Sequence, residues 1–436
     1  MKGTPREAAV KVIQEVMEGK TFSNIAVHEY LSSAKWSQAD ANLFVNLVYG
    51  TLEQYQLLNH FLQQLSRRPI KKIDTPIRNL MLISIYQLMN FDRVPGYAVV
   101  NEAVNISRKT NPSAAGFVNG ILRNVIRQKD SLKQSIPMGT DPDALSLRFS
   151  YPKWMIKELL KEYDETTALN ILTASQTAPN VFIRCNLLRC HTDELITSLQ
   201  EEGVLAEKTE WLPEALKILK SAVNLTDTEA YWKGWFQIQS ISSMLAVEAL
   251  NPQPGEQILD MAAAPGGKSL FMAERMKNKG LVVARDLSED RLKQLEQHQK
   301  RMGTSIIKTQ VFDATQDDPA LKDRMDKVLL DAPCSSLGMI RRKPEIRYST
   351  KSKGILKQMA TLQLGMLERA AGFVKPGGWV LYSTCTLFSY ENQDVIRLFL
   401  ERHPQFELEP EGMKFLNPAI HPDLDGFFMA KLKRLE

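Results

Sequence analysis

The sequence predicts a multidomain protein with an all-α N-terminal bundle, a small α+β middle module and a C-terminal α/β domain built on a doubly wound, mostly parallel sheet. Three observations lead to this prediction. Residues 1 to about 135 have apolar positions at helical spacing only, residues 135–144 are rich in Pro, Gly and Asp, and from about residue 255 apolar strands alternate with helical segments. We therefore expect domains at residues 1–140, 145–235 and 236–436.

The N-terminal region is expected to be a compact helical bundle. Apolar residues recur at helical spacing in residues 5–18, 40–65, 75–90, 98–109 and 114–128. A turn at Val94-Pro95-Gly96 and a stop at Asn111-Pro112 separate the last three segments, and the connections are short.

The middle region contains both the apolar spacing of helices and that of strands. It reads as a helix at 151–163, a strand at 180–188, a helix at 192–204 and a strand at 235–239, followed by a helix at 242–250. This combination indicates a small α+β module.

Regular alternation marks the C-terminal region. Strands are expected at 257–262, 281–286, 307–313, 327–333 and 379–386, with helices at 268–276, 288–303 and 350–374. Alternation with short loops is typical of a doubly wound sheet with helices on both faces.

The composition narrows the class of protein. Of 436 residues, 44% are hydrophobic and 24% are charged, which is ordinary for a soluble globular chain. No apolar run approaches the roughly 18–20 residues of a membrane-spanning helix, and the N-terminus has no secretory signal core. With four cysteines, six histidines and no CxxC pair, we expect reduced thiols, a cytoplasmic location, and no metal site.

The charge is unevenly distributed along the chain. Residues 1–140 carry 17 Lys and Arg against 10 Asp and Glu, whereas the whole chain has a net charge of only +5. A basic front half favours a polyanionic partner such as a nucleic acid.

The residues that follow each predicted strand should line a ligand site, because open α/β sheets bind ligands beyond the carboxyl ends of their strands. Asp260 ends the first strand and is followed by a turn of small residues that leads into a helix N-terminus, which suits an anionic group. Asp286 ends the second strand, where a carboxylate can accept hydrogen bonds from ribose hydroxyls. The candidate cofactor-binding residues are Ala262, Ala263, Ala264, Pro265, Gly266, Gly267, Lys268, Asp286, Asp313 and Asp331.

The turn favours one cofactor over two others. Gly267-Lys268-Ser269 matches the end of the phosphate-loop pattern, but Ala262 stands where that pattern needs its first glycine, and the dinucleotide pattern GxGxxG is absent. A nucleoside with a small zwitterionic tail fits better, which points to S-adenosylmethionine.

Two thiols fall at the same edge of the sheet. Cys334 follows the fourth strand in Asp331-Ala332-Pro333-Cys334, and Cys385 ends the fifth in Ser383-Thr384-Cys385. A thiol beside a methyl donor suits methylation of cytosine carbon 5, because addition of a thiolate to carbon 6 makes carbon 5 nucleophilic. Asp331 would stabilise the adduct near ring nitrogen 3, and a base must then remove the carbon 5 proton. The target base must be unpaired or flipped out.

The motifs resemble those of a known family. The segments LDMAAAPGGKS, LLDAPCSSLGMIRRKPEIRY and LYSTCTLFSYEN are similar to the RNA 5-methylcytosine methyltransferases, and DAPCS followed about fifty residues later by STC is a specific signature. LVYGTLEQY, DRVPGYAVVNEAV and GFVNGILRNVIR resemble the NusB-like RNA-binding domain. The combination resembles the bacterial small-subunit rRNA cytosine methyltransferases over essentially the whole chain.

The resemblance implies roles that the residues alone leave open. It implies that Cys385 is the nucleophile and that Cys334 aids product release, whereas the sequence by itself leaves the two interchangeable. It implies a Rossmann-like domain that binds S-adenosylmethionine through the turn and the aspartates named above, with Asp331 also near the base. The expected substrate is 16S rRNA, and we expect a monomer.

Basic residues near the thiols are candidate RNA contacts. Arg341, Arg342, Lys343 and Arg347 follow the Cys334 loop and are expected to bind phosphates, which position RNA without reading its sequence. A second basic run, with weaker support, is Arg67, Arg68, Lys71 and Lys72.

Three alternatives stay open at this point. A tRNA cytosine-C5 methyltransferase is the nearest. A P-loop nucleotide hydrolase is disfavoured by Ala262, and a non-catalytic RNA-binding factor is disfavoured by the intact Asp331, Cys334 and Cys385.

Overall fold

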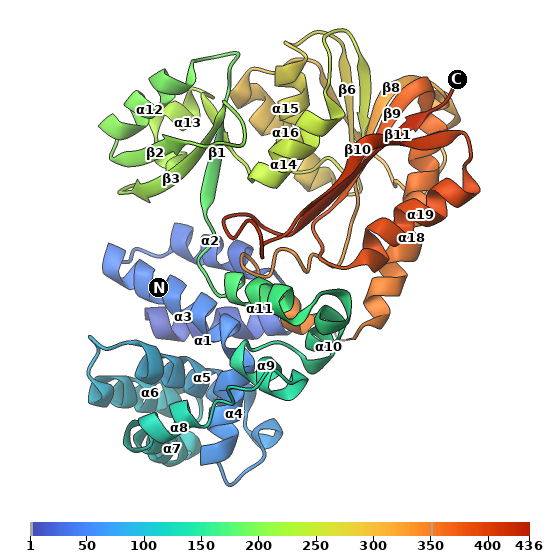
Figure 1. Ribbon diagram of the computed structural model, residues 1–436. Coiled ribbons are helices and arrows are strands. Elements are labelled where there is room, and N and C mark those ends of the chain that lie inside the picture. Colours follow the sequence, from blue (N-terminus) through green and yellow to red (C-terminus); the bar gives the residue numbers. More distant parts are fainter. Residues whose placement is uncertain (1–2, 350–351) are drawn as a thin grey trace. The chain divides into compact units, whose positions relative to one another are not determined.

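The computed structural model describes residues 3–349 and 352–436, which fall into two compact units (Figure 1). The first unit comprises Met1–Thr177 and Met339–Lys353, and the second comprises Ala178–Gly338 and Gly354–Glu436. The predicted fold class is confirmed: a helical N-terminal region, an α+β middle module and a C-terminal α/β domain. Residues 1–2 of the predicted first domain and 350–351 of the predicted helix 350–374 lie outside the described residues.

The first unit is built from helices around one apolar core. Helix α5 lies at its centre, since it buries residues on every side, including Ile77, Leu80 and Ile83. The helices are α1 Pro5–Met17, α2 Ser23–Ser33, α3 Gln38–Glu53, α4 Tyr55–Leu65, α5 Thr75–Asn90, α6 Gly96–Thr110, α7 Ala115–Arg127, α8 Lys129–Gln134, α9 Pro142–Arg148, α10 Lys153–Glu162, α11 Glu165–Ala174 and α17 Ile346–Ser349.

The segment 339–353 belongs to this helical unit although it follows the Cys334 loop in sequence. The buried carboxylate of Glu345 accepts hydrogen bonds from the backbone N–H and from Oγ of Ser23, both at 2.8 Å. Tyr348 donates to the Ser150 carbonyl at 3.0 Å and packs its ring 5.3 Å from that of Tyr55. The segment is therefore an integral part of the first unit.

The compact units do not follow the domain boundaries expected from the sequence. Helices α10 and α11, which fall in the expected module 145–235, belong to the first unit, whereas the strands of that module belong to the second. One reason is Arg347, which donates to the carbonyls of Glu53 (2.7 Å) and Ser175 (3.4 Å) and so joins the end of α11 to α3.

The second unit begins with a four-stranded antiparallel sheet in the order β2-β3-β1-β4. This module is attached to the larger sheet domain by a buried ion pair between Arg184 of β1 and Glu274 of α15, 2.6 Å apart, with the guanidinium 4.4 Å from the Phe271 ring centroid. Its elements are β1 Val181–Cys185, α12 Thr192–Glu201, β2 Val204–Lys208, β3 Ala215–Ser221, α13 Glu229–Trp232 and β4 Phe236–Ile238.

The larger sheet has seven strands in the order β10-β11-β9-β8-β5-β6-β7. Strands β9, β8, β5, β6 and β7 are parallel, whereas β10 and β11 form an antiparallel hairpin on the β9 edge that the sequence did not predict. Its elements are α14 Ile241–Leu250, β5 Gln257–Asp260, α15 Gly267–Arg275, β6 Leu281–Asp286, α16 Glu289–Met302, β7 Ile307–Val311, β8 Met325–Asp331, α18 Gly354–Phe373, β9 Val374–Thr384, α19 Gln393–Arg402, β10 Phe406–Leu416 and β11 Phe427–Arg434.

Helices cover both faces of this sheet. Helices α14, α15 and α16 pack on one face, and α18 and α19 pack on the other, so that the core consists of two apolar layers (Figure 1). The register pairs Asp260 with Ala284 and with Leu329, and Asp331 with Ser383, which aligns the carboxyl ends of the strands at one edge. Within the described residues, no helix is long and apolar enough to cross a membrane.

Replacing Glu345 by Ala should destabilise the first unit, because the N–H of Ser23 and its hydroxyl lose a buried acceptor. We expect a loss of about 1–3 kcal/mol, measured by denaturant unfolding. Asp92→Ala, which removes an exposed carboxylate of the same unit, is the control and should change the stability little. Equal stability of the two variants would contradict the structural role of the segment.

Candidate active site

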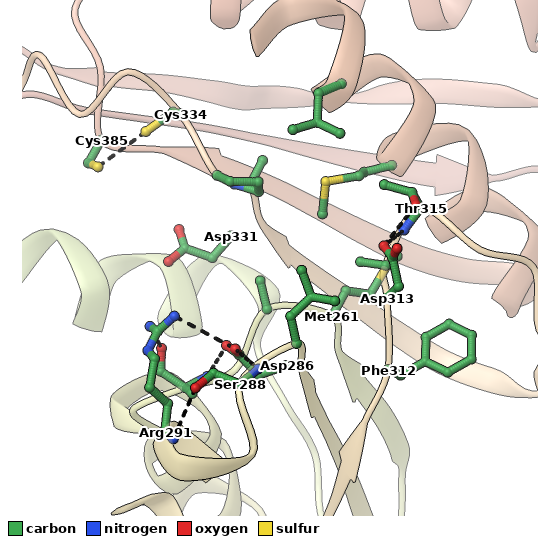
Figure 2. A pocket seen from close by; sticks show the side chains of 18 of the residues that line it. Met261, Asp286, Ser288, Arg291, Phe312, Asp313, Thr315, Asp331, Cys334 and Cys385 are labelled. Atoms are coloured by element: carbon green, nitrogen blue, oxygen red, sulfur yellow. Dashed lines mark hydrogen bonds and ion pairs between the residues drawn. The ribbon is translucent and has the colours of Figure 1, made fainter. Parts of the chain in front are cut away.

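A cavity of about 420 Å³ lies at the carboxyl edge of the larger sheet (Figure 2). Seven of the residues predicted from the sequence line it: Ala262, Ala264, Asp286, Asp313, Asp331, Cys334 and Cys385. They come from the ends of five different strands and the loops that follow them, as expected for an open α/β sheet. The topology therefore brings together groups that are up to 123 residues apart in sequence.

The turn after β5 is held close to the end of β6. The N–H of Ala263 donates to the Arg285 carbonyl at 2.8 Å, and the N–H of Ala264 donates to Asp286 Oδ2 at 3.1 Å. Gly266 has φ +106°, and a Cβ on it would lie 2.5 Å from Leu295 Cγ. This packing leaves no room for a side chain at position 266, and Gly266 lines neither this cavity nor the one described next.

A second cavity of about 220 Å³ adjoins the other side of the turn. Predicted residues Ala262, Ala263, Ala264, Pro265, Gly267 and Lys268 line it, and Ala262, Ala264 and Asp331 border both cavities. The predicted cofactor turn thus separates two neighbouring cavities.

The carboxylates of Asp286 and Asp313 lie at the end of the larger cavity away from Cys334 and Cys385 (Figure 2). Asp286 Oδ1 accepts from the N–H of Ser288 at 3.0 Å, and Arg291 lies 3.7 Å away. Asp313 Oδ1 accepts from the N–H and the hydroxyl of Thr315, and these hydrogen bonds lower the pKa of Asp313. Both groups are thus held as hydrogen-bond acceptors.

Asp331 is fixed at the end of β8 by two donors. Lys268 Nζ lies 2.5 Å from its Oδ2, and Ser383 Oγ donates to its Oδ1 at 2.7 Å. Burial alone would lower the pKa of Lys268, but attraction to Asp331 outweighs it and the pKa is raised. Lys268 is therefore held as a cation next to the thiols.

The two thiols meet in the cavity, with their sulfur atoms 3.2 Å apart (Figure 2). A hydrogen bond from Cys334 lowers the pKa of Cys385, burial opposes this, and Ser336 and Lys268 lower it further. The same contact and burial raise the pKa of Cys334, and the nearby Glu391 raises it more. The carboxylate of Asp331 opposes the thiolate on Cys385, but the hydrogen bonds outweigh it, so the thiolate is favoured on Cys385, a distinction that the sequence left open.

Glu391, to which the sequence alone assigns no role, joins the two thiol loops. Its carboxylate accepts hydrogen bonds from the N–H of Ser335 (2.8 Å), from the hydroxyl of Thr386 (3.2 Å) and from Gln363 Nε2 (3.0 Å). Burial raises the pKa of Glu391. The only signal in the sequence was an acidic residue in the segment that follows Cys385.

The predicted basic cluster belongs to the first unit, and none of its residues lines this cavity. Arg347 is fully buried and donates to backbone carbonyls, so the prediction that it binds a phosphate is wrong. Arg341 is buried as well, whereas Arg342 and Lys343 are half-buried, with Lys343 4.5 Å from the Phe22 ring centroid. The run at Arg67, Arg68, Lys71 and Lys72 is exposed.

The residues of the larger cavity fit a nucleoside-bearing methyl donor. Asp286 and Asp313 offer acceptors for hydroxyl and amino groups, and Met261, Phe312, Leu362 and Met366 supply apolar walls. No cluster of His, Cys, Asp and Glu that could hold a metal occurs among the described residues.

Comparison with known proteins identifies the three regions. Residues 247–433 match the family model described as 16S rRNA methyltransferase RsmB/F, residues 4–127 match the NusB family, and residues 151–226 match the RsmF/B-like ferredoxin-like domain. The matched ranges agree with the fold class predicted from the sequence.

Similar proteins span the whole chain. The probable ribosomal RNA small subunit methyltransferase B of Bacillus subtilis (strain 168) is 32% identical over 99% of each chain. The ribosomal RNA small subunit methyltransferase B of Serratia proteamaculans (strain 568) is 31% identical over 98% of each chain. The crystal structure of PH0851 aligns over 100% of both chains with a TM-score of 0.84 and 29% identity.

The fold and the site define the class: an S-adenosylmethionine-dependent methyltransferase domain joined to a NusB domain, which confirms the predicted cofactor. Within that class, the chain belongs to the family of the ribosomal RNA small subunit methyltransferase B proteins. The resemblance noted in the sequence is thereby confirmed, and the nucleotide hydrolase alternative is removed.

Alkylation with iodoacetamide tests whether the pKa of Cys385 is lower than that of Cys334. The labelling rate of each thiol is measured as a function of pH by peptide mass mapping. Cys385 should be labelled before Cys334, with a midpoint below the ~8.5 of a free thiol, because a lowered pKa keeps the thiolate present at lower pH.

Two variants test whether the hydrogen bond from Cys334 causes the lowered pKa of Cys385. Cys334→Ala removes the hydrogen bond and should raise the midpoint of Cys385, whereas Cys334→Ser keeps a donor and should raise it less. Earlier labelling of Cys334, or a midpoint unchanged in Cys334→Ala, would contradict the assignment.

Proposed function

We propose that this protein methylates carbon 5 of a cytosine in 16S rRNA through a covalent bond between Cys385 and carbon 6 of the base. The observation that carries the proposal is the pair of thiols, 3.2 Å apart, in the cavity that also holds Asp331. The relatives' names support an rRNA substrate over tRNA.

The reaction needs a nucleophile of unusual reactivity, and Cys385 supplies it. Its thiolate adds to carbon 6, which places the electron pair on carbon 5 and leaves the ring as an enamine. To Asp331, held by Lys268 and Ser383, we assign the stabilisation of the adduct at ring nitrogen 3. S-adenosylmethionine, when bound, supplies the methyl group to carbon 5.

Product release needs a base. After transfer, carbon 5 carries both a proton and the methyl group, and removal of that proton expels the Cys385 thiolate and restores the ring. We assign this step to Cys334, whose sulfur touches that of Cys385. Cys334 acts as a thiolate in this step, after its own proton has been released to solvent, and its raised pKa makes that thiolate a strong base for the carbon 5 proton.

RNA contacts are proposed in the first unit. The exposed run Arg67, Arg68, Lys71 and Lys72, together with the half-buried Arg342 and Lys343, would neutralise phosphates. Arg347 is left out of this set because its guanidinium is buried.

Methylation of 16S rRNA, read by bisulfite sequencing of RNA from cells with and without the gene, tests the target. We expect one protected cytosine in 16S rRNA that is lost without the gene. A protected cytosine that is lost from tRNA instead would favour the alternative substrate.

The two cysteine variants test the chemistry. Cys385→Ala should abolish methylation and leave binding of S-adenosylmethionine nearly intact. Cys334→Ala should accumulate a covalent protein–RNA adduct on a denaturing gel, because addition proceeds and release stalls. If the two phenotypes were exchanged, the roles of the thiols would be reversed.

A further inference from the structure

The second cavity contains a buried amide that the mechanism does not use. Gln239 is 7% exposed, and neither its Oε1 nor its Nε2 has a hydrogen-bond partner within the described residues. A buried amide without partners costs free energy, so such groups mark sites where a ligand or water completes the bonding.

The backbone holds Gln239 in place at the wall of this cavity. Its N–H donates to the Phe182 carbonyl at 3.2 Å, and the next residue, Ser240, caps α14 by accepting from the N–H of Ser243. A Cβ on Gly267 would lie 3.7 Å from Gln239 Cδ, so that the amide faces the first residue of α15. The amide and the N-terminus of α15 thus border the same space.

We propose that Gln239 binds the amino-acid tail of S-adenosylmethionine, with Nε2 donating a hydrogen bond to the tail carboxylate at the N-terminus of α15.

The shape of the site supports one ligand across both cavities. The cavities share Ala262, Ala264 and Asp331, so a ligand whose nucleoside lies by Asp286 and Asp313 would reach the second cavity past the turn. The N-terminus of α15, where the first N–H groups have no partner inside the helix, and the cation of Lys268 favour a carboxylate there.

A target base fits the second cavity less well. Neither thiol lines it, no aromatic ring lines it, and its walls are mainly the polar side chains of Gln239, Ser240, Ser243 and Asp260 with small residues of the turn. Flipped-out bases are held by stacking on aromatic or apolar groups, whereas a short zwitterionic tail needs polar partners. The inference rests on the methyl donor and not on the identity of the methylated base.

Calorimetric titration of the full chain with two ligands tests the proposal. S-adenosylhomocysteine carries the amino-acid tail, and 5′-methylthioadenosine lacks it. Gln239→Met keeps the volume of the side chain and removes both polar atoms. It should weaken S-adenosylhomocysteine about tenfold or more, as expected for one hydrogen bond to a charged group, and leave methylthioadenosine unchanged within about twofold.

Controls separate this role from a structural one. Gln253→Met, at an exposed position, should change neither affinity. Without ligand, Gln239→Met should be at least as stable as the natural protein in denaturant unfolding, because the lost amide had no partner.

Two results would overturn the proposal: equal weakening of both ligands, or unchanged binding of S-adenosylhomocysteine, whether the KM for RNA is unchanged or raised. Unchanged ligand binding together with a raised KM for RNA would indicate that Gln239 contacts the target base. Neither result depends on whether the methylated base is cytosine, so failure here is distinguishable from failure of the proposed function.

Discussion

The parallel pairing of β8 with β9 is the constraint on which the site depends. Its register sets Asp331 opposite Ser383, and the side chains of these two residues bond to each other. Cys334 and Cys385 follow this pair by three and two residues, so both loops must leave the sheet at the same point. The contact at 3.2 Å between the two sulfur atoms follows from this register, and Glu391 then fixes the loops that carry them.

Hydrogen bonds and nearby charges give the two similar thiols different pKa shifts. The hydrogen bond from Cys334 lowers the pKa of Cys385, whereas the buried Glu391 disfavours negative charge on Cys334. The proposed reaction requires such a difference, because one sulfur attacks as a thiolate and the other stays protonated until it is needed, as a thiolate, to take the carbon 5 proton. Structural support comes also from the ferredoxin-like module, where Arg184 bonds to Glu274 and to the carbonyl of Gly267 in the cofactor turn.

Much of the fold and most of the cavity could be predicted from sequence, for a physical reason. Parallel strands buried on both faces are apolar runs, and the polar residues directly after them must meet at one edge. Asp286, Asp331, Cys334 and Cys385 were found in this way. The hairpin β10–β11 was missed because its strands lie after the last helix, outside the strand–helix alternation, and β10 is interrupted by an irregularity between Leu408 and Met413.

Other features depend on contacts between distant segments, which spacing in the sequence does not show. Arg347 reads as a surface cation in a basic run, yet it is buried by α3 and α11 of the helical unit. Nothing in the sequence distinguishes Glu391 and Gln239 from other polar residues. Their roles follow only from the thiol loops and the second cavity that surround them in the structure. The claim that Cys385 is the nucleophile is tested most directly with RNA that contains 5-fluorocytosine, since fluorine at carbon 5 cannot leave as a proton and the adduct persists. Peptide mass mapping of the trapped complex should place the nucleotide on Cys385; a nucleotide on Cys334, or no covalent complex with the natural protein, would contradict the account.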